Sequence, residues 1–280
     1  MMNTLGVDIG GTKIYVARYN ANMKLEAETK VLTQADKPKE ETLNNLIQAI
    51  EEVRDENTKS VGIAWAGFVD SEKGRIVKAP NVPNLDGFAL CEYITDKIKL
   101  PSFIENDARA FAFGARQSVE PNSKITLGII LGTGVGSGIV IEGQILKGAH
   151  GYAGEIGHMV VQQKEIEAWL SGPGIKKHLG LDASTQFSEI LPKQKQSLLP
   201  PLENHLNIFA QWLSGLVLTF DPDTIILGGG AARYFWQHFE AEIINRTNDQ
   251  LENYPHDFQL HFYNQNNAGA AGAAALCRLK

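Results

Sequence analysis

The sequence predicts an α/β protein made of two related lobes. Short apolar segments of strand length alternate with longer segments of helical periodicity, an order that favours mostly parallel sheets covered by helices. A strand that runs into a glycine turn occurs at 5–12 and again at 127–134, which indicates an internal duplication. A length of 280 residues accommodates two domains, and we expect one lobe over 1–120 and the other over 121–265. Related lobes would place the glycine turns of both halves around one cleft.

The first lobe begins with a predicted hairpin. Apolar strands at 5–9 and 14–17 flank the glycines at 10 and 11, which suit a tight turn. Leucine, isoleucine and valine then recur at helical spacing, which predicts a helix over 39–57. The remaining elements expected here are a strand at 60–65, a loop at 78–87, a helix around 90–98, a strand at 102–105 and a helix at 108–115.

The second lobe restarts the pattern with a strand at 125–131, a glycine turn at 132–138 and a returning strand at 139–141. Apolar periodicity predicts the elements that follow: helices at 165–178 and 203–220, a strand at 224–227, a glycine run at 228–230, a helix at about 235–253 and a strand near 258–263. A final alanine-rich helix at about 266–280 is expected to return to the first lobe.

Composition excludes several classes of protein. Hydrophobic residues make up 43% of the chain and charged residues 21%, as in ordinary folded proteins. The net charge of −6 and the lack of a dense basic cluster argue against a nucleic-acid partner. No segment approaches the roughly 20 apolar residues that span a bilayer, so we expect a cytoplasmic protein without a membrane partner. Cys91 and Cys277 lack CxxC spacing and are interpreted as reduced, buried thiols.

The glycine turns are the most informative feature for function. Three of them follow apolar strands directly, at 10–11, 132–138 and 228–230. Backbone N–H groups without a neighbouring side chain can approach phosphate oxygens, so the turns indicate a nucleotide site. The turn at 132–138 does not end in the Gly-Lys-Ser/Thr of a Walker P-loop. The turn at 10–11 lacks the spaced third glycine of a dinucleotide-binding fold. Glycines that serve only tight hairpins remain the alternative.

Two aspartates stand beside predicted turns or helix starts. Asp8 ends the first strand, where its carboxylate would hold a hydrated Mg²⁺ near phosphates or cap nearby N–H groups. Lys13 would contact phosphate or be a solvated strand residue. Asp107 precedes a helix and would act as a base or as a helix cap, and spacing alone favours the cap.

A sparse acidic and imidazole set follows at Glu155, His158 and Glu167. These side chains suit several sugar hydroxyls, but the same residue types also occur in metal sites. Taken singly, they are most simply interpreted as structural groups with satisfied hydrogen bonds.

Four ordered motifs carry a family resemblance: LGVDIGGTK at 5–13, ENDA at 105–108, GTGVG at 132–136 and GYAGEIGH at 151–158. In this order the chain resembles the ROK family of sugar kinases and repressors, from about Gly6 to the final helix. The resemblance implies the duplicated actin-like, ribonuclease-H-like fold with a cleft between the lobes. It also implies ATP and Mg²⁺ as cofactors.

Matching positions carry over the family's roles. Asp107 resembles the general base. The resemblance assigns Mg²⁺ binding, through water, to Asp8. It assigns the first phosphate segment to Gly10, Gly11, Thr12 and Lys13, and the second to Gly132, Thr133 and Gly134. The turn near the adenosine is assigned to Gly228, Gly229 and Gly230. It assigns the sugar hydroxyls to Asn81, Asn106, Asp107, Glu155, His158 and Glu167.

One departure from the family concerns zinc. Typical members follow the Gly-His pair with a cysteine-rich zinc loop, but only residues 159–166 separate His158 from Glu167 here, and none is a cysteine. We therefore expect no zinc, with His158 held by hydrogen bonds or in direct contact with the sugar.

The resemblance implies an ATP-dependent hexose kinase, with glucose as the first substrate and its 6-hydroxyl as the acceptor. N-acetylglucosamine, N-acetylmannosamine and fructose kinases share nearly all the motifs and remain alternatives. A non-catalytic sugar-sensing regulator is an alternative of another class. The family's repressors carry a helix-turn-helix region before the glycine-turn motif, and because Asp8 comes so early we expect none here. A homodimer is also implied.

Overall fold

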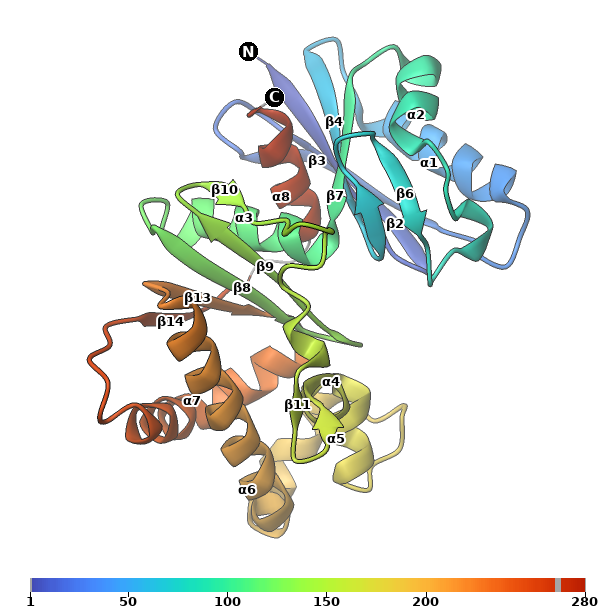
Figure 1. The fold of residues 1–280 in the computed structure, drawn as a ribbon. Helices are drawn as coiled ribbons and strands as arrows, with labels where there is room; N and C mark the ends of the chain where they lie inside the picture. The colour runs from blue at the N-terminus through green and yellow to red at the C-terminus, as the bar shows by residue number, and fades with distance from the viewer. Residues whose placement is uncertain (1, 265–267, 280) are drawn as a thin grey trace. The chain divides into compact units, whose positions relative to one another are not determined.

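The computed structural model describes residues 2–264 and 268–279, with side chains described outside 187–201. The chain forms two compact units (Figure 1). The first comprises Met1–Ser118, Lys147–Tyr152 and Gln265–Lys280, and the second comprises Val119–Leu146 and Ala153–Asn264. Each unit is built around its own five-stranded sheet.

The sheet of the first unit has the strand order β3-β2-β1-β4-β7. Its strands are β1 (Asn3–Ile9), β2 (Lys13–Tyr19), β3 (Leu25–Leu32), β4 (Thr58–Trp65) and β7 (Ser102–Asn106). The first three are antiparallel neighbours, whereas β4 and β7 continue parallel to β1. The register aligns Ile9 with Trp65 and Trp65 with Asn106, so β1, β4 and β7 end along one edge.

Helices cover both faces of this sheet. These helices are α1 (Lys39–Val53), α2 (Leu90–Ile98), α3 (Asp107–Val119) and α8 (Ala268–Cys277). The unit also contains the short 3₁₀ helix η1 (Pro83–Leu85) and a hairpin of β5 (Phe68–Asp70) and β6 (Arg75–Lys78). Leu5, Val7 and Ile9 pack with the apolar faces of α1 and α2. The opposite face packs against α8, where Ala270 and Ala274 contact Tyr15.

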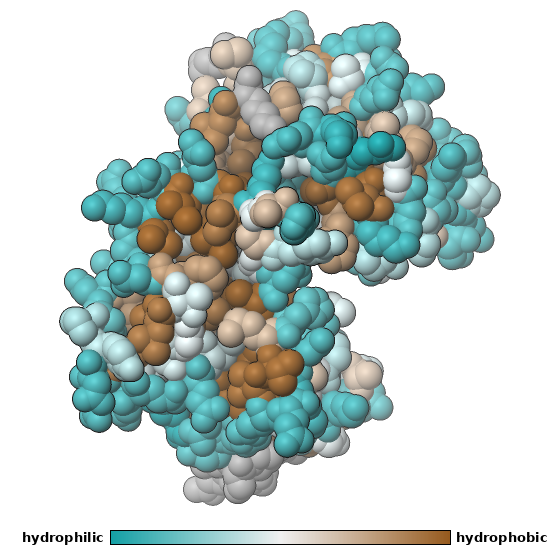
Figure 2. Space-filling view, in the orientation of Figure 1, coloured by the Kyte–Doolittle hydropathy of each residue, from teal (hydrophilic) through white to brown (hydrophobic). Residues whose placement is uncertain are grey.

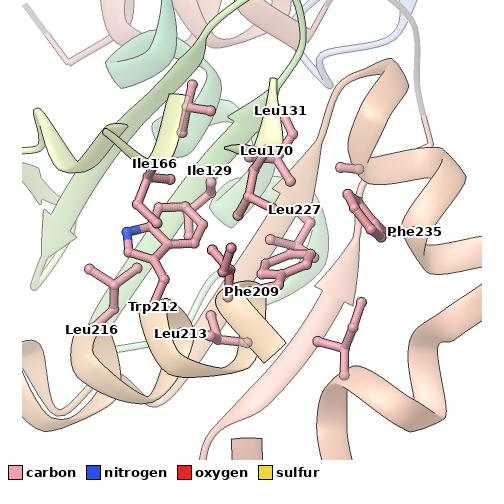
Figure 3. Close-up of a cluster of buried hydrophobic side chains, with 14 of the residues drawn as sticks. Ile129, Leu131, Ile166, Leu170, Phe209, Trp212, Leu213, Leu216, Leu227 and Phe235 are labelled. Carbon is pink, nitrogen blue, oxygen red and sulfur yellow. The ribbon is translucent and has the colours of Figure 1, made fainter. Parts of the chain in front are cut away.

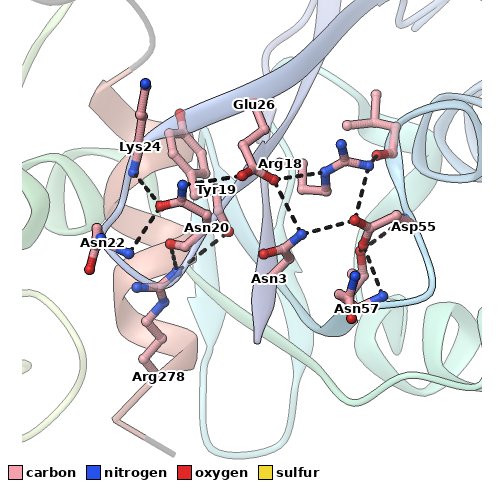
Figure 4. A network of polar contacts seen from close by, with 12 residues as sticks. Asn3, Arg18, Tyr19, Asn20, Asn22, Lys24, Glu26, Asp55, Asn57 and Arg278 are labelled. Carbon is pink, nitrogen blue, oxygen red and sulfur yellow. Dashed lines mark hydrogen bonds and ion pairs between the residues drawn. The ribbon is translucent and has the colours of Figure 1, made fainter. Parts of the chain in front are cut away.

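Glycines bring α8 close to the sheet. A Cβ atom on Gly62 would lie 1.9 Å from the carbonyl oxygen of Ala273, and one on Gly6 would lie 2.0 Å from that of Ala270. Only a residue without a side chain permits such contact between backbones. Arg278 ties down the end of the helix: its Nη1 donates to the Ala21 carbonyl oxygen at 2.7 Å. Its Nη2 donates to the Asn20 carbonyl oxygen (Figure 4).

The second unit contains a sheet of order β10-β9-β8-β13-β14. The strands are β8 (Ile125–Leu131), β9 (Val135–Ile141), β10 (Gln144–Ile145), β13 (Thr224–Gly228) and β14 (Gln259–Phe262). The other elements are η2 (Ile156–His158), the hairpin of β11 (Val160–Val161) and β12 (Lys164–Glu165), and helices α4 (Ile166–Leu170), α5 (Gly172–His178), α6 (Phe187–Phe220) and α7 (Gly230–Gln250).

The core of the second unit lies between its central strands and these helices. Ile129, Leu131 and Leu227 of β8 and β13 meet Phe209 and Trp212 of α6, with side chains of α4 and α7 completing the cluster (Figure 3). Hydrophilic side chains cover most of the surface visible in Figure 2, interrupted by smaller hydrophobic areas. Over the described residues, none of the helices has both the length and the apolar character needed to span a bilayer.

Most predicted elements are confirmed, but several boundaries and one helix were wrong. The helix expected over 39–57 ends at Val53, and the returning strand expected at 139 begins at Val135. The helix expected from 235 begins at Gly230, the one expected from 203 begins at Phe187, and residues 266, 267 and 280 of the predicted final helix lie outside the described residues.

The single helix predicted over 165–178 is in fact two helices. Ser171 has an extended backbone (φ −69°, ψ 158°), and its side chain accepts a hydrogen bond from the Gly174 N–H. Pro173 follows in the first turn of α5, where its missing N–H costs nothing. Local capping therefore overrides the apolar periodicity that favoured one helix.

Candidate active site

Asp8 lies near the end of β1 and is only partly exposed to solvent. Burial, and then the nearby charge of Asp107, raise the pKa of Asp8 to about 7. A Cβ on Gly269 of α8 would lie 3.1 Å from the Oδ2 atom of Asp8. A buried carboxylate next to a second one is stabilised by a cation. Asp8 therefore fits a hydrated Mg²⁺, which proteins usually hold through one or two carboxylates and water.

The first glycine turn follows Asp8 at once. The Gly10 N–H donates to the Lys13 carbonyl oxygen at 3.1 Å, and the Thr33 hydroxyl donates to the Gly10 carbonyl oxygen at 2.6 Å. The Thr33 N–H also donates to the Thr12 carbonyl oxygen at 3.0 Å. The turn is thus fixed through its carbonyl groups, and the side chains of Thr12 and Lys13 are exposed.

Asn81 lies against this turn. A Cβ on Gly11 would be 3.0 Å from the Asn81 Cβ, so a larger residue at 11 would push the two segments apart. The loop of Asn81 is closed by Asp86, whose Oδ1 accepts from the Ala79 N–H at 2.6 Å and whose carboxylate pairs with Lys78. A predicted sugar residue and a predicted phosphate residue are therefore neighbours.

Asn106 and Asp107 are hydrogen-bonded to each other at the start of α3. The Asn106 Oδ1 accepts from the Arg109 N–H at 3.2 Å, while its Nδ2 donates to the Gly67 carbonyl oxygen and to the Asp107 Oδ1, both at 3.1 Å. Asp107 Oδ1 also accepts from the Ala108 N–H at 2.9 Å. Asn106 therefore makes the capping bond to the third residue of the helix, while Asp107 accepts one further N–H of the first turn. Asp107 thus has one oxygen fixed in orientation beside Asp8.

Arg109 is a residue that the sequence reasoning missed. Its guanidinium is buried, lies 3.6 Å from the Glu105 carboxylate and donates to the Gly151 carbonyl oxygen. The following Tyr152 meets the ring of Phe68 edge-on at 5.5 Å between centroids. An arginine among the small and apolar residues of 108–115 was the available signal. Arg109 anchors the segment that begins the GYAGEIGH motif.

The second glycine turn, in the other unit, is held from two sides. The Gly132 N–H donates to the Gly134 carbonyl oxygen at 2.9 Å, and the Gly172 N–H donates to the Gly132 carbonyl oxygen at 2.7 Å. The Glu167 Oε2 accepts from the Val135 N–H at 2.9 Å. A Cβ on Gly134 would lie 2.6 Å from that oxygen, so a larger residue there would displace the Glu167 carboxylate. Glu167, predicted for sugar, contacts the backbone of the phosphate turn.

A cavity of about 390 Å³ opens beside this turn. Its walls combine a hydroxyl and a carboxylate from the predicted site with basic groups from α5 and the β11–β12 hairpin. The lining residues are Thr133, Lys164, Glu165, Glu167, Ala168, Ser171, Pro173, Gly174, Lys177 and His178.

The third glycine turn meets the second one. Gly229 has φ +92° and precedes α7, and a Cβ on it would lie 2.4 Å from the Leu131 carbonyl oxygen. Because β13 runs parallel to β8, with Gly228 opposite Ile130, both strands deliver their turns to one edge of the sheet. The predicted adenosine and phosphate turns are therefore adjacent within the second unit.

His158 lies among carboxylates at the end of η2. Its Nδ1 is 3.1 Å from Glu165 Oε2, and its Nε2 is 3.9 Å from Glu155 Oε2. The hydrogen bond to Glu165 raises the pKa of His158, although partial burial works in the opposite direction. The described part of the chain contains no group of three or more His, Cys, Asp and Glu side chains arranged to hold a metal ion. Glu155 and His158 are exposed, and sugar contact by either stays a prediction.

Comparison with known proteins identifies the family. The profile of the ROK family matches residues 4–280. A glucokinase of Thermotoga maritima is 27% identical over 263 residues, with 83% of each chain covered. An N-acetylmannosamine kinase of Citrobacter koseri is 26% identical over 299 residues, with 99% of each chain covered.

A solved structure agrees with these matches. A ROK hexokinase from Thermus thermophilus has a TM-score of 0.81 at 25% identity, over 98% of this chain and 97% of that chain. The fold is thus the actin-like ATPase fold of ROK sugar kinases, and the chain belongs to the ROK family.

Proposed function

We propose that the protein is an ATP-dependent sugar kinase that phosphorylates a hexose, with glucose and its 6-hydroxyl as the first candidates. The observation that carries this proposal is the pair of Asp8 and Asp107. Asp8 lies on β1 and Asp107 directly follows β7, and these two strands end along the same edge of one sheet. The charge of Asp107 contributes to the raised pKa of Asp8. Two carboxylates in different environments suit two roles: one accepts a proton as a general base, and the other binds a cation.

Asp107 is the proposed general base. A sugar hydroxyl is a weak nucleophile until a carboxylate accepts its proton, and general-base catalysis contributes roughly 10²–10⁴-fold. As the proton passes to Asp107, the hydroxyl oxygen forms a bond to the γ-phosphorus, the bond from that phosphorus to the β–γ bridging oxygen breaks, and ADP leaves. The bonds from Asn106 and Ala108 hold one Asp107 oxygen in place, which fixes the direction of the other.

The phosphates would be bound by backbone groups and by Asp8. Mg²⁺ neutralises developing charge on the phosphate oxygens when it is bound. Asp8 would hold it through water, while Gly10, Gly11, Thr12 and Lys13 receive one end of the triphosphate. In the second unit, Gly132, Thr133 and Gly134 would bind phosphate, and Gly228, Gly229 and Gly230 would lie near the adenosine.

The sugar would be held by amide, carboxylate and imidazole groups, whose directional hydrogen bonds read hydroxyl positions. The proposed set is Asn81, Asn106, Asp107, Glu155, His158 and Glu167. Matches to proteins named glucokinase and N-acetylmannosamine kinase support a sugar substrate at this level. N-acetylglucosamine, N-acetylmannosamine and fructose are the alternative acceptors. A kinase that uses ATP and a free sugar is expected in the cytoplasm, and we propose a homodimer without zinc.

A coupled ADP-release assay tests the proposal. The protein is incubated with Mg-ATP and each of glucose, N-acetylglucosamine, N-acetylmannosamine, fructose, mannose and allose, and the product is identified by ³¹P NMR. A sugar-dependent rate with a sugar 6-phosphate product is expected. A folded protein that binds ATP but turns over none of these sugars would instead favour a non-catalytic sugar-sensing regulator.

A further inference from the structure

The β11–β12 hairpin links His158 to Glu167, two of the proposed sugar residues. It is a two-residue hairpin, with Val161 opposite Lys164, and both turn residues, Gln162 and Gln163, have positive φ (49° and 64°). Two positive φ values are typical of the turn that matches the twist of paired strands. The hairpin therefore has a defined register, which fixes where Glu165 projects.

Glu165 makes one side-chain contact that bears on the site. Its Oε2 atom lies 3.1 Å from the Nδ1 of His158. An Nδ1–H that donates to a carboxylate leaves the Nε2 atom of a neutral imidazole as an acceptor, so one partner sets the tautomer and the ring orientation. The Nε2 atom faces Glu155 at 3.9 Å, a separation longer than a hydrogen bond.

The fold does not depend on the Glu165 side chain. Glu165 occupies the N-cap position of α4, yet its side chain makes no capping bond. The hairpin is closed by backbone pairing, by the Ile166 N–H to the Met159 carbonyl oxygen at 2.9 Å, and by Trp169 Nε1 to the Val161 carbonyl oxygen at 3.0 Å. The carboxylate is 53% exposed, so its removal leaves no buried cavity.

We propose that Glu165 is a positioning residue for sugar binding: it holds the imidazole of His158 with Nε2 directed at a sugar hydroxyl. This inference rests on the proposed function, because it concerns the same sugar site. The hydroxyl would donate to Nε2 of the neutral imidazole or accept from Nε2–H of the protonated ring, while Glu165 keeps a proton on Nδ1 in both states. Glu165 acts only through His158 and takes no part in phosphoryl transfer.

Kinetics of matched variants test this role. Loss of one orienting hydrogen bond is expected to raise the KM for the sugar by about 5- to 10-fold in Glu165→Ala, with kcat and the KM for ATP within about twofold of wild type. Glu165→Gln keeps an acceptor oxygen and is expected to stay within about twofold in sugar KM. Glu252→Ala, at an exposed glutamate of the same unit, is the control.

A double-mutant cycle separates action through His158 from a direct effect. The variant carrying both Glu165→Ala and His158→Ala is expected to match His158→Ala alone in sugar KM. Additive effects of the two changes, or an unchanged sugar KM in Glu165→Ala, would overturn the proposal.

The imidazole itself gives a readout that needs no turnover. Long-range ¹H–¹⁵N NMR spectra, with His158→Ala for assignment, are expected to show His158 protonated on Nδ1 in wild type and Glu165→Gln, and a changed tautomer pattern in Glu165→Ala. Identical His158 signals in Glu165→Ala and wild type would refute the positioning role. If no sugar is phosphorylated, the proposed kinase function fails, and these spectra still decide whether Glu165 orients His158.

Discussion

Replacing Asp8 with asparagine should stabilise the metal-free protein at neutral and higher pH. The raised pKa, about 7 against an ordinary 3.8, means that the fold favours the protonated, neutral carboxyl. Burial is the larger cause, and the charge of Asp107 is the second. Asparagine has nearly the same shape and carries no charge, so it would remove the unfavourable interaction and keep the packing.

The pKa difference sets the size and the sign of the effect. Below about pH 4 the carboxyl is protonated in both the folded and the unfolded chain, so the substitution should change the free energy of unfolding little. Between about pH 4 and pH 7 the unfolded chain releases the proton while the folded chain retains it, so wild-type stability falls as the pH rises. Above pH 7 the full difference applies, about 4 kcal/mol in favour of Asp8→Asn.

Urea unfolding in the presence of EDTA, at about pH 4, 6 and 8, measures this difference. Asp96→Asn, at an exposed position on α2, is the matched control and should show no such trend. Replacing EDTA by Mg-ATP at pH 8 should stabilise wild type more than Asp8→Asn, because the variant lacks the charge that favours a cation. A variant that is less stable than wild type at pH 8, or a stability difference that does not change with pH, would refute the reasoning.

Three further changes test the structure around the site. Gly62→Ala should lower the free energy of unfolding by about 3 kcal/mol or more in urea titrations, because its Cβ would lie 1.9 Å from the Ala273 carbonyl oxygen; Gly215→Ala, which meets nothing within 4 Å, should not be destabilising. Asn106→Ala should cost about 1 kcal/mol of stability through the lost helix cap and should also lower kcat, and an unchanged kcat would mean that its amide does not orient the base. Gln163→Gly should raise the melting temperature by relieving a positive φ of 64°, worth about 1 kcal/mol, and a lowered melting temperature would contradict the turn geometry.

The strands that could be predicted each consist of a continuous run of mostly apolar residues. β1 and β8 are buried on both faces and run into glycine turns, so their existence and direction could be inferred from residue type alone. β3 was missed because it is an edge strand whose residues are half-buried or exposed, and half of them are polar. The β11–β12 hairpin was missed because its strands are two residues long and its turn contains glutamines rather than Asn-Gly.

The candidate site was predictable as a set of residues but not as a set of contacts. Asp8 and Asp107 were identified from their motifs, whereas their mutual charge effect depends on the parallel alignment of β1, β4 and β7. Glu167 reaches the backbone of Val135 across 32 residues of sequence, a pairing that only tertiary packing creates. Glu165 carries no motif, so its bond to His158 could not be inferred from spacing.

Asp107 is assigned as the base that accepts the proton of a sugar hydroxyl during phosphoryl transfer. The most direct measurement compares wild type with Asp107→Asn in single-turnover formation of sugar phosphate, with circular dichroism and ATP binding to confirm folding. A rate loss of roughly 10²–10⁴-fold is expected in the variant, with ATP affinity changed little. A folded Asp107→Asn protein that forms sugar phosphate within a few-fold of the wild-type rate would contradict the assignment of Asp107 as the base.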